Sequence, residues 1–235
     1  MTAEKDLSAK PRVIVWFRKD LRLRDNPALE AAYEAGKEII PVFIWNENEG
    51  GQWSPGAASR WWLHQSLKDL GQSIASLNGR LILRKGLAED VLPQLAKSVG
   101  ADVVLFNRVY DSAGQKTQVS VETALRLTDV KSQSYNASLL NEPWEIKNGS
   151  GKPYQVFTPY WRASRSGIYR KPSSYEPANL AFNGLDSKSE KLNDLSLLPN
   201  HPWHTKLHSH WTVSEDEGHR MISRTTEEVT RYYSN

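Results

Sequence analysis

Short apolar runs that alternate with helical patterns constrain the fold of this chain more than any other feature. Each run is rich in β-branched and aromatic residues and is followed by a longer segment with helical periodicity. The runs are VIVWF (13–17), IIPVFIW (39–45), RLILR (80–84) and DVVLFN (102–107). Because continuous apolar runs of this length are typical of strands covered on both faces, they predict four buried parallel strands.

The segments between the runs carry signals for helix starts and ends. Asn26 is placed to cap a first helix, with Pro27 at its first position and Gly36 after its end. We expect a second helix to start at Ser54, followed by Pro55. Its predicted buried stripe, at spacings of three, four and seven, consists of Trp62, Leu63, Leu67, Leu70, Ile74 and Leu77.

Two further helical segments, at 88–99 and 115–127, lead to a fifth strand near 131–135. This alternation predicts the α/β class, with a doubly wound, five-stranded parallel sheet of Rossmann-like topology. The sheet is expected to be followed by a long linker and the start of a helical region. We therefore divide the chain into an α/β domain at 11–166, a surface linker at 167–200 and a final segment at 201–235, with an amphipathic helix near 215–233.

Charge and cysteine content exclude several classes of protein. Thirty Lys and Arg face 27 Asp and Glu, and this net charge of +3 is too small for a histone-like nucleic-acid binder. The absence of cysteine excludes disulfides, thiolate zinc sites and a cysteine nucleophile. The polar N-terminus lacks a signal-peptide core, and no apolar window is long enough to cross a membrane. We expect a soluble, cytoplasmic protein without membrane partners.

The candidate ligand site lies in the loops after the strands. In an open α/β sheet, ligands bind beyond the carboxyl ends of the strands, where the strand order reverses. That rule selects RKDLRLRDN (18–26), NENEGGQWS (46–54), KGLAED (85–90) and NRVYDSAG (107–114). The charges of the first loop either clamp an anionic ligand or pair with one another. No glycine-rich dinucleotide motif follows the first strand, the segment NGSGKPY is not a P-loop, and no G-x-S-x-G nucleophile elbow occurs.

A histidine cluster near the C-terminal end is the candidate metal site. Its members are His201, His204, His208 and His210. Their spacings of three, four and two are compatible with metal ligation. Pro202 disfavours a regular helix here, and no carboxylate completes a known metal motif, so we expect no specific metal site.

Several ordered segments resemble the DNA photolyase and cryptochrome family. They are VWFRKDLRLRDNPAL, WSPGAASRWWLHQSLKDL, NRVYDSAGQKTQ, NEPWEIKNGSGKPYQVFTPYWRA and LPNHPWHTKLHSHWT. Together they cover roughly residues 12–211, in the order and spacing of the family's N-terminal α/β domain and linker. The second and fourth most resemble bacterial cyclobutane pyrimidine dimer photolyases.

The resemblance implies a molecule of two parts. In the family, the α/β domain holds an antenna chromophore, either a folate such as methenyltetrahydrofolate or an 8-hydroxy-deazaflavin. A C-terminal helical domain binds FAD and UV-damaged DNA and carries out light-driven electron transfer. Its phosphate loop and tryptophan chain have no counterpart here, and the segment from Trp211 to Glu215 departs from the family pattern. We therefore expect 201–235 to be the beginning of a truncated FAD domain, with no FAD bound by this chain alone.

The resemblance also implies site residues, all of them chromophore contacts rather than catalytic or metal-binding groups. They are Arg18 after the first strand, Trp45 and Asn46 after the second, and Asn107, Tyr110 and Asp111 after the fourth. Folate-binding relatives carry Glu at the place of Asp111, where it bonds the pterin ring. A second reading makes Asn107 and Asp111 a helix cap and first-turn acid.

Two functions of different classes follow. The first is the antenna-binding part of a deoxyribodipyrimidine photolyase, a carbon–carbon lyase that repairs pyrimidine dimers, with the chain not catalytically competent alone. The alternative is a stand-alone, cryptochrome-like signalling or interaction module that docks on a separate helical subunit. A nucleotide-binding relative of the same topology is a third, weaker option, because a fold does not fix a function.

Overall fold

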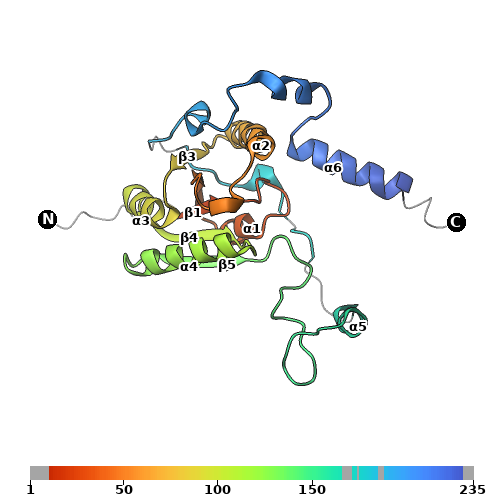
Figure 1. Ribbon diagram of the computed structural model, residues 1–235. Coiled ribbons are helices and arrows are strands. Elements are labelled where there is room, and N and C mark those ends of the chain that lie inside the picture. The colour runs from red at the N-terminus through yellow and green to blue at the C-terminus, as the bar shows by residue number, and fades with distance from the viewer. Residues whose placement is uncertain (1–10, 166–170, 174, 185–187, 230–235) are drawn as a thin grey trace.

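The centre of the molecule is a parallel sheet of five strands in the order β3-β2-β1-β4-β5 (Figure 1). The computed structural model describes residues 11–165, 171–173, 175–184 and 188–229. The strands are β1 (Arg12–Phe17), β2 (Glu38–Trp45), β3 (Ile82–Lys85), β4 (Ala101–Asn107) and β5 (Lys131–Tyr135). The predicted doubly wound sheet is confirmed. The strand order reverses between β1 and β4, and β3 starts two residues later than predicted.

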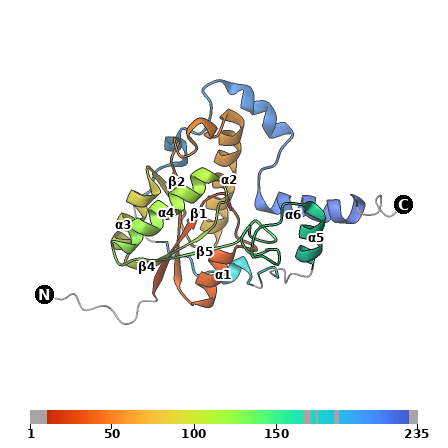
Figure 2. The same ribbon diagram turned by 60° about the horizontal axis from the view of Figure 1, so that its bottom comes forward.

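Helices cover both faces of the sheet (Figure 2). Helices α1 (Pro27–Glu34) and α2 (Ala57–Ser76) pack on one face, and α3 (Ala88–Val99) and α4 (Ser112–Arg126) pack on the other. Successive side chains of β1 pack alternately on the two faces of the sheet. Val13 belongs to the apolar cluster with α1 and α2, and Ile14 to the cluster with α3 and α4. This period of two over a wholly buried strand explains why the run looks uniformly apolar in the sequence.

Two helix starts differ from the predictions. Helix α1 begins as expected, with the Asn26 side chain accepting the N–H of Leu29. Helix α2 begins at Ala57 rather than near Ser54, because the Ser54 N–H closes a 3₁₀ turn on Gly51. Helix α4 begins three residues earlier than predicted, because Asp111 caps it.

The buried stripe of α2 is also displaced from the prediction. Trp61 is 1% exposed, whereas Trp62, which we had assigned to the stripe, is 44% exposed. Leu67, Leu70 and Ile74 are buried as predicted. The helical period alone does not decide which of two adjacent tryptophans is buried. The packing of α2 on the sheet buries Trp61.

The stretch predicted as a surface linker adds side chains to the core. Tyr175, Leu180, Leu195 and Leu197 are buried in the same cluster as α1 and α2. Ile39 of β2 donates its N–H to the carbonyl of Ala181, and its own carbonyl accepts the N–H of Asn183. The segment thus pairs with the first part of β2, before the residues of β2 that pair with β3. Where it is described, the stretch is therefore packed on the sheet domain, and its domain boundaries stay a prediction.

Two short helices project from the body on the same side (Figure 1). Helix α5 (Phe157–Arg165) lies at the end of an extended arm. Helix α6 (Glu215–Arg224) is capped by Ser214 and continues into a π-helical turn, Thr225–Val229. In the part of the chain that the structure describes, no helix is both long and apolar enough to cross a membrane.

Candidate functional site

A cavity of about 750 Å³ opens at the carboxyl ends of β1, β2 and β4, where the strand order reverses. Its volume is within the range of about 300–1,000 Å³ that small-molecule sites occupy. Three of the four loops selected from the sequence contribute to its wall, and the loop after β3 does not. The lining includes Trp16, Arg18, Lys19, Asp20, Phe43, Trp45, Asn46, Glu49, Trp53, Ser59, Trp62, Leu63, Val109, Asp111 and Gly114.

Arg18 is the buried cation of this cavity. The residue is 8% exposed, and its guanidinium lies 4.5 Å from the centre of the Trp16 ring. Nη2 donates to the carbonyl of Gly114 at 2.9 Å and contacts Glu49 at 3.4 Å. Nη1 is buried and has no hydrogen-bond partner among the residues that the structure describes. A buried donor without a partner is costly, so this group is suited to a ligand that offers an acceptor.

Burial and neighbouring carboxylates shift the pKa of Arg18 in opposite directions. Desolvation lowers the pKa of the guanidinium from its ordinary value, and the neighbouring carboxylates of Glu49, Asp20 and Asp111 act in the other direction. An arginine keeps its proton under all such conditions. The cavity therefore contains a permanent positive charge with part of its hydrogen-bonding capacity unused.

Gly114 allows the close approach on which the Arg18 contact depends. A Cβ atom at this position would lie 2.8 Å from Cγ1 of Val109 and 3.3 Å from Nη2 of Arg18. A side chain would therefore displace Val109 and push the guanidinium away from the Gly114 carbonyl. This glycine was not identified from the sequence, because only its contacts with Arg18 and Val109 in the folded chain give it a role.

Asp111 is the N-cap of α4 and also lines the cavity, while its contact with a chromophore stays a prediction. Its carboxylate caps α4 by accepting the Gly114 N–H at 2.9 Å, and it pairs with Lys19 Nζ at 2.7 Å on the rim of the cavity. Burial acts against ionisation, but the bonds from Lys19 and the Gly114 amide hold the pKa of Asp111 below its ordinary value. The residue is thus an ionised cap that also lines the cavity.

Asn107 lies behind the wall of the cavity and is not part of its lining. Its Nδ2 donates to Asn26 Oδ1 at 2.7 Å and to a carboxylate oxygen of Asp20. The other oxygen of Asp20 accepts the Arg18 N–H at 2.9 Å. The side chain therefore supports the loop that carries Arg18, and its chromophore contact stays a prediction.

Tyr110 also lies outside the lining, because its side chain is turned toward another partner. Its hydroxyl donates to Glu142 at 2.5 Å, and the same buried carboxylate accepts two bonds from Arg108. Burial and the contact with Glu142 raise the pKa of Tyr110 to about 12. This cluster attaches the arm that leads to α5, and the contact of Tyr110 with a chromophore stays a prediction.

The loop after β2 supplies two predicted residues and two that had not been singled out. Trp45 and Asn46, which the resemblance makes chromophore contacts, line the cavity. Glu49 contacts Arg18, and Trp53 stands 83% exposed at the rim. Both belong to a loop that the switch-point rule had selected, so the sequence signal was the loop itself rather than any residue type in it.

The histidine cluster does not form a metal centre in the described structure. His204 and His208 lie on the 3₁₀ helix Pro202–Ser209, and the His208 ring packs edge-on against Trp61. Among the residues that are described, no group of three or more histidine or acidic side chains is arranged to hold a metal ion. The contacts of His208 indicate that this segment packs on α2.

Comparison with known proteins identifies relatives of the chain. The family model for DNA photolyase matches residues 13–178. A deoxyribodipyrimidine photo-lyase of Agrobacterium fabrum is 42% identical over 204 residues, which are 86% of this chain and 42% of that protein. Cryptochrome-2 of Arabidopsis thaliana is 44% identical over 152 residues, covering 64% of this chain and 25% of the relative.

A solved structure shows the same arrangement over almost the whole chain. The crystal structure of a bacterial class III photolyase from Agrobacterium tumefaciens superposes with a TM-score of 0.83 at 38% identity. The match covers 97% of this chain and 46% of the other. The chain thus spans less than half the length of the relatives named here.

Proposed function

The chain belongs to the DNA photolyase family, and from this premise we propose that its cavity binds an antenna chromophore. The chromophore is methenyltetrahydrofolate or an 8-hydroxy-deazaflavin. The observation that carries the proposal is the unpaired Nη1 of the buried Arg18 in the wall of a cavity of about 750 Å³ at the switch point of the sheet. Both chromophores have fused nitrogen heterocycles whose carbonyl oxygens can accept a bond from that group.

The residues of the cavity fit a flat ligand with one polar edge. Trp16, Phe43 and Trp45 supply apolar surface from the ends of β1 and β2. Arg18 supplies the donor, and the ionised pair of Lys19 and Asp111 lies at the rim. Apolar walls with a few convergent polar groups are the usual composition of a small-molecule site. When bound, the chromophore would absorb near-ultraviolet and blue light.

We propose that the chain serves light-driven repair of pyrimidine dimers only together with a helical FAD-binding unit. Energy collected by an antenna has no effect on repair without the flavin that donates the electron. Contact with UV-damaged DNA is assigned to that unit, and the proposed compartment is the cytoplasm. Under this proposal the polypeptide alone repairs no dimer-containing oligonucleotide under blue light, and the same assay with a flavin-binding unit present tests the assembly.

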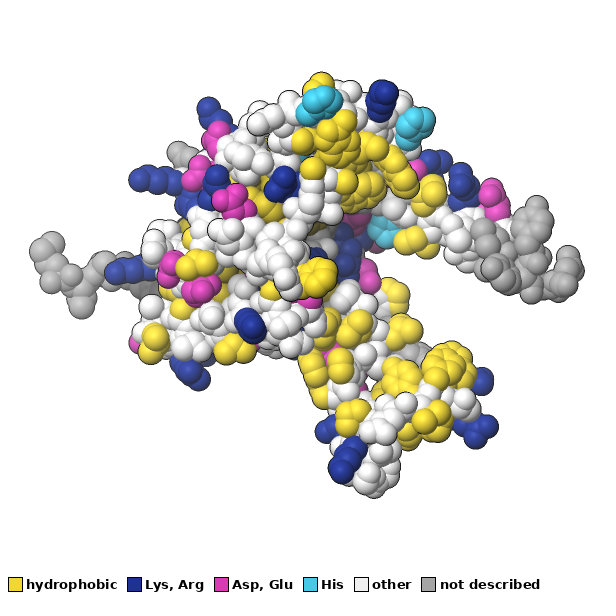
Figure 3. Space-filling model, viewed as in Figure 1, with side chains coloured by type: hydrophobic (Ala, Val, Ile, Leu, Met, Phe, Trp, Pro, Cys, Tyr) yellow, Lys and Arg dark blue, Asp and Glu magenta, His cyan; other side chains and the backbone are white. Residues whose placement is uncertain are grey.

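The surface of the molecule supports a partner of this kind. Apolar side chains gather over α5 and on the opposite side of the hollow that separates α5 from the upper part of the molecule (Figure 3). On α5 and just before it, the exposed members are Val156, Phe157, Tyr160 and Trp161. Exposed apolar groups that gather in this way are typical of interaction surfaces.

A matched pair of variants on α2 tests the chromophore site. Ser59 lines the cavity and is exposed, whereas its neighbour Ala58 is exposed and lies outside the lining. We expect wild-type protein to bind one of the two chromophores in a fluorescence titration. Ser59→Trp should reduce the affinity at least tenfold by filling the cavity, and Ala58→Trp should leave it unchanged. Failure of wild-type protein to bind either chromophore, or full binding by Ser59→Trp, would refute the proposal.

The second candidate function is a cryptochrome-like signalling or interaction module without repair activity. It is favoured by the 44% identity to Cryptochrome-2 of Arabidopsis thaliana. The two candidates differ in one outcome: reconstitution with a flavin-binding helical unit restores dimer repair under the first and gives a light-dependent complex without repair under the second.

A further inference from the structure

The chromophore cavity shares a wall with a second cavity of about 360 Å³. The second cavity lies between the loop after β1, helix α2 and the start of α6. The residues that line both are Leu21, Arg22, Trp62 and Ser66. A change in how α6 sits on the body would therefore reach side chains of the chromophore cavity directly.

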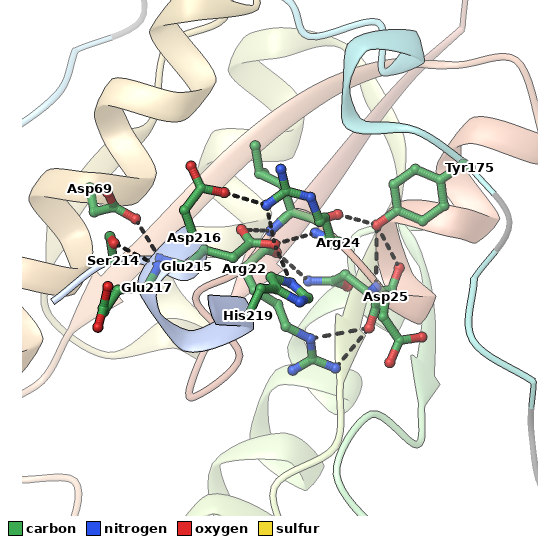
Figure 4. Close-up of polar contacts among 12 residues, drawn as sticks. Arg22, Arg24, Asp25, Asp69, Tyr175, Ser214, Glu215, Asp216, Glu217 and His219 are labelled. Atoms are coloured by element: carbon green, nitrogen blue, oxygen red, sulfur yellow. Dashed lines mark hydrogen bonds and ion pairs between the residues drawn. The ribbon is translucent and has the colours of Figure 1, made fainter. Parts of the chain in front are cut away.

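Glu215, the first residue of α6, attaches that helix to the loop after β1 (Figure 4). One carboxylate oxygen accepts the N–H of Leu23 at 2.6 Å, and the other accepts the N–H of Arg24 at 2.7 Å. The Glu215 N–H in turn donates to Asp69 of α2 at 3.0 Å. The side chain is largely buried, with 12% of it exposed. Charge-assisted bonds from two successive amides to one carboxylate are stronger than neutral ones and fix its orientation.

The loop that Glu215 holds is the same loop that carries the chromophore-cavity residues. Asp20 accepts the Arg18 N–H, and its carbonyl accepts the N–H of Arg22 at 2.7 Å. The Arg22 side chain donates to the carbonyls of Asp25 and Ala137. One continuous hydrogen-bonded loop therefore presents Arg18 to the cavity at its start and is anchored by α6 near its end.

We propose that Glu215 is a positioning residue for the chromophore site, and that docking of α6 and binding of the chromophore are coupled through residues 18–24. The proposal rests on the function proposed above, because it concerns the same cavity. Coupling between two sites is reciprocal. A contact that strengthens chromophore binding is therefore strengthened, by the same factor, when the chromophore binds.

The test compares Glu215→Ala with Asp216→Asn in the full chain. Asp216 is the neighbouring acid, and its ion pair with the Arg24 side chain at 2.6 Å is exposed. Such surface pairs contribute little. In titrations with methenyltetrahydrofolate and 8-hydroxy-deazaflavin, we expect Glu215→Ala to weaken the binding that wild-type protein shows by about fivefold or more. Asp216→Asn should bind as wild-type protein does.

Amide hydrogen exchange supplies a readout that does not require the chromophore. The N–H groups of Leu23 and Arg24 should exchange faster in Glu215→Ala than in wild-type protein or Asp216→Asn. Adding chromophore should slow these two amides in wild-type protein by the factor by which Glu215→Ala weakens binding. A residue with a merely structural role would not produce that reciprocal change. Asp69→Ala, which removes the acceptor on α2, should shift both readouts in the same direction and serves if Glu215→Ala does not fold.

The outcomes separate this proposal from the proposed function. If wild-type protein binds neither chromophore, the proposed function fails, and unchanged exchange at Leu23 and Arg24 in Glu215→Ala then overturns the positioning role as well. If wild-type protein binds a chromophore and both Glu215→Ala and Asp69→Ala bind it equally well, only the coupling is overturned. An equal loss in Asp216→Asn would also overturn it, because the effect would follow charge rather than the two amide contacts.

Discussion

Residues 12–135 and the described residues that follow them are held in place by different kinds of contact. In the first region, buried apolar side chains from strands and helices form two continuous clusters on the faces of the sheet. The second region adds only a few of its described side chains to one of these clusters, such as Leu180 and Leu195, and is otherwise attached by polar contacts with the backbone of the first region. Tyr175 and Glu215 make such contacts at the loop after β1, and Ala181 and Asn183 pair with Ile39 of β2.

The two regions therefore derive their stability from different interactions. Burial of apolar area is additive over many residues and tolerates small shifts, whereas a bond between one side chain and one amide depends on exact placement. The first region should therefore unfold as a unit, and the attached segments should open locally at a lower free energy. Both regions meet at residues 18–26. This loop forms part of the cavity wall, and Tyr175 and Glu215 bond to it.

The largest effect is expected from a cavity in the core of the first region. Ile14 on β1 is completely buried, so Ile14→Ala should lower the free energy of unfolding by about 2–5 kcal/mol. Urea denaturation followed by circular dichroism measures this. The control, Ile222→Ala on α6, where the side chain is 65% exposed, should change stability by less than about 0.5 kcal/mol. Equal losses in the two variants would show that the regions do not differ.

A smaller and local effect is expected at the attachment of the 175–184 segment. The Tyr175 hydroxyl donates to the Leu23 carbonyl and accepts the Asn26 N–H at 3.2 Å. Tyr175→Phe leaves both buried groups without this partner and should cost about 1–3 kcal/mol.

Amide hydrogen exchange shows which part of the structure loses stability in Tyr175→Phe. Amides of residues 23–26 should exchange faster in Tyr175→Phe, while those of β1 stay protected until global unfolding. The matched control is Tyr33→Phe, on the half-exposed ring that packs beside Tyr175. If β1 lost protection in parallel with residues 23–26, the attached segments would belong to the same cooperative unit as the sheet.

The smallest effect is a pH dependence at the contact between α2 and the segment near Asn193. His64 is buried, and its Nε2 lies 3.4 Å from Asn193 Oδ1. Burial lowers the pKa of His64 from its ordinary value of 6.5, with a further contribution from Lys68. Because the unfolded chain binds the proton more readily, stability should fall as the pH drops through 6.5 toward the lower folded-state pKa and then level off. His64→Gln should flatten this slope in denaturation curves, and an unchanged slope would exclude His64 as its source.

The predictability of the fold follows the same division. The first four strands and the two helical layers come from apolar runs and periodic stripes, because these patterns record burial directly. The fifth strand, KSQSY, is polar and was predicted from the alternation of strands and helices. In α2, Trp61 is buried where the period predicted Trp62. Helical periodicity does not distinguish two large apolar residues that are adjacent in the sequence. Tyr175 and Glu215 left no local signal, because each acts on a loop about 150 or more residues away along the chain.

The candidate site was predictable at the level of loops rather than side chains. The switch-point rule and the family resemblance placed Arg18, Trp45, Asn46 and Asp111 at what is the cavity wall. Tyr110 follows the same strand as Asp111 but bonds to Glu142 on a separate arm. The direction of a side chain after a strand depends on partners that are distant in sequence, and no pattern within the loop records them.

We propose that the cavity at the switch point of the sheet recognises a chromophore through Arg18. A crystal structure of the chain with its bound chromophore tests this most directly. We expect a carbonyl oxygen of the chromophore ring system within about 3 Å of Arg18 Nη1, with the ring system between the ends of β1 and β2. A chromophore seated elsewhere, for example in the hollow beside α5, with Nη1 still unpaired, would contradict it.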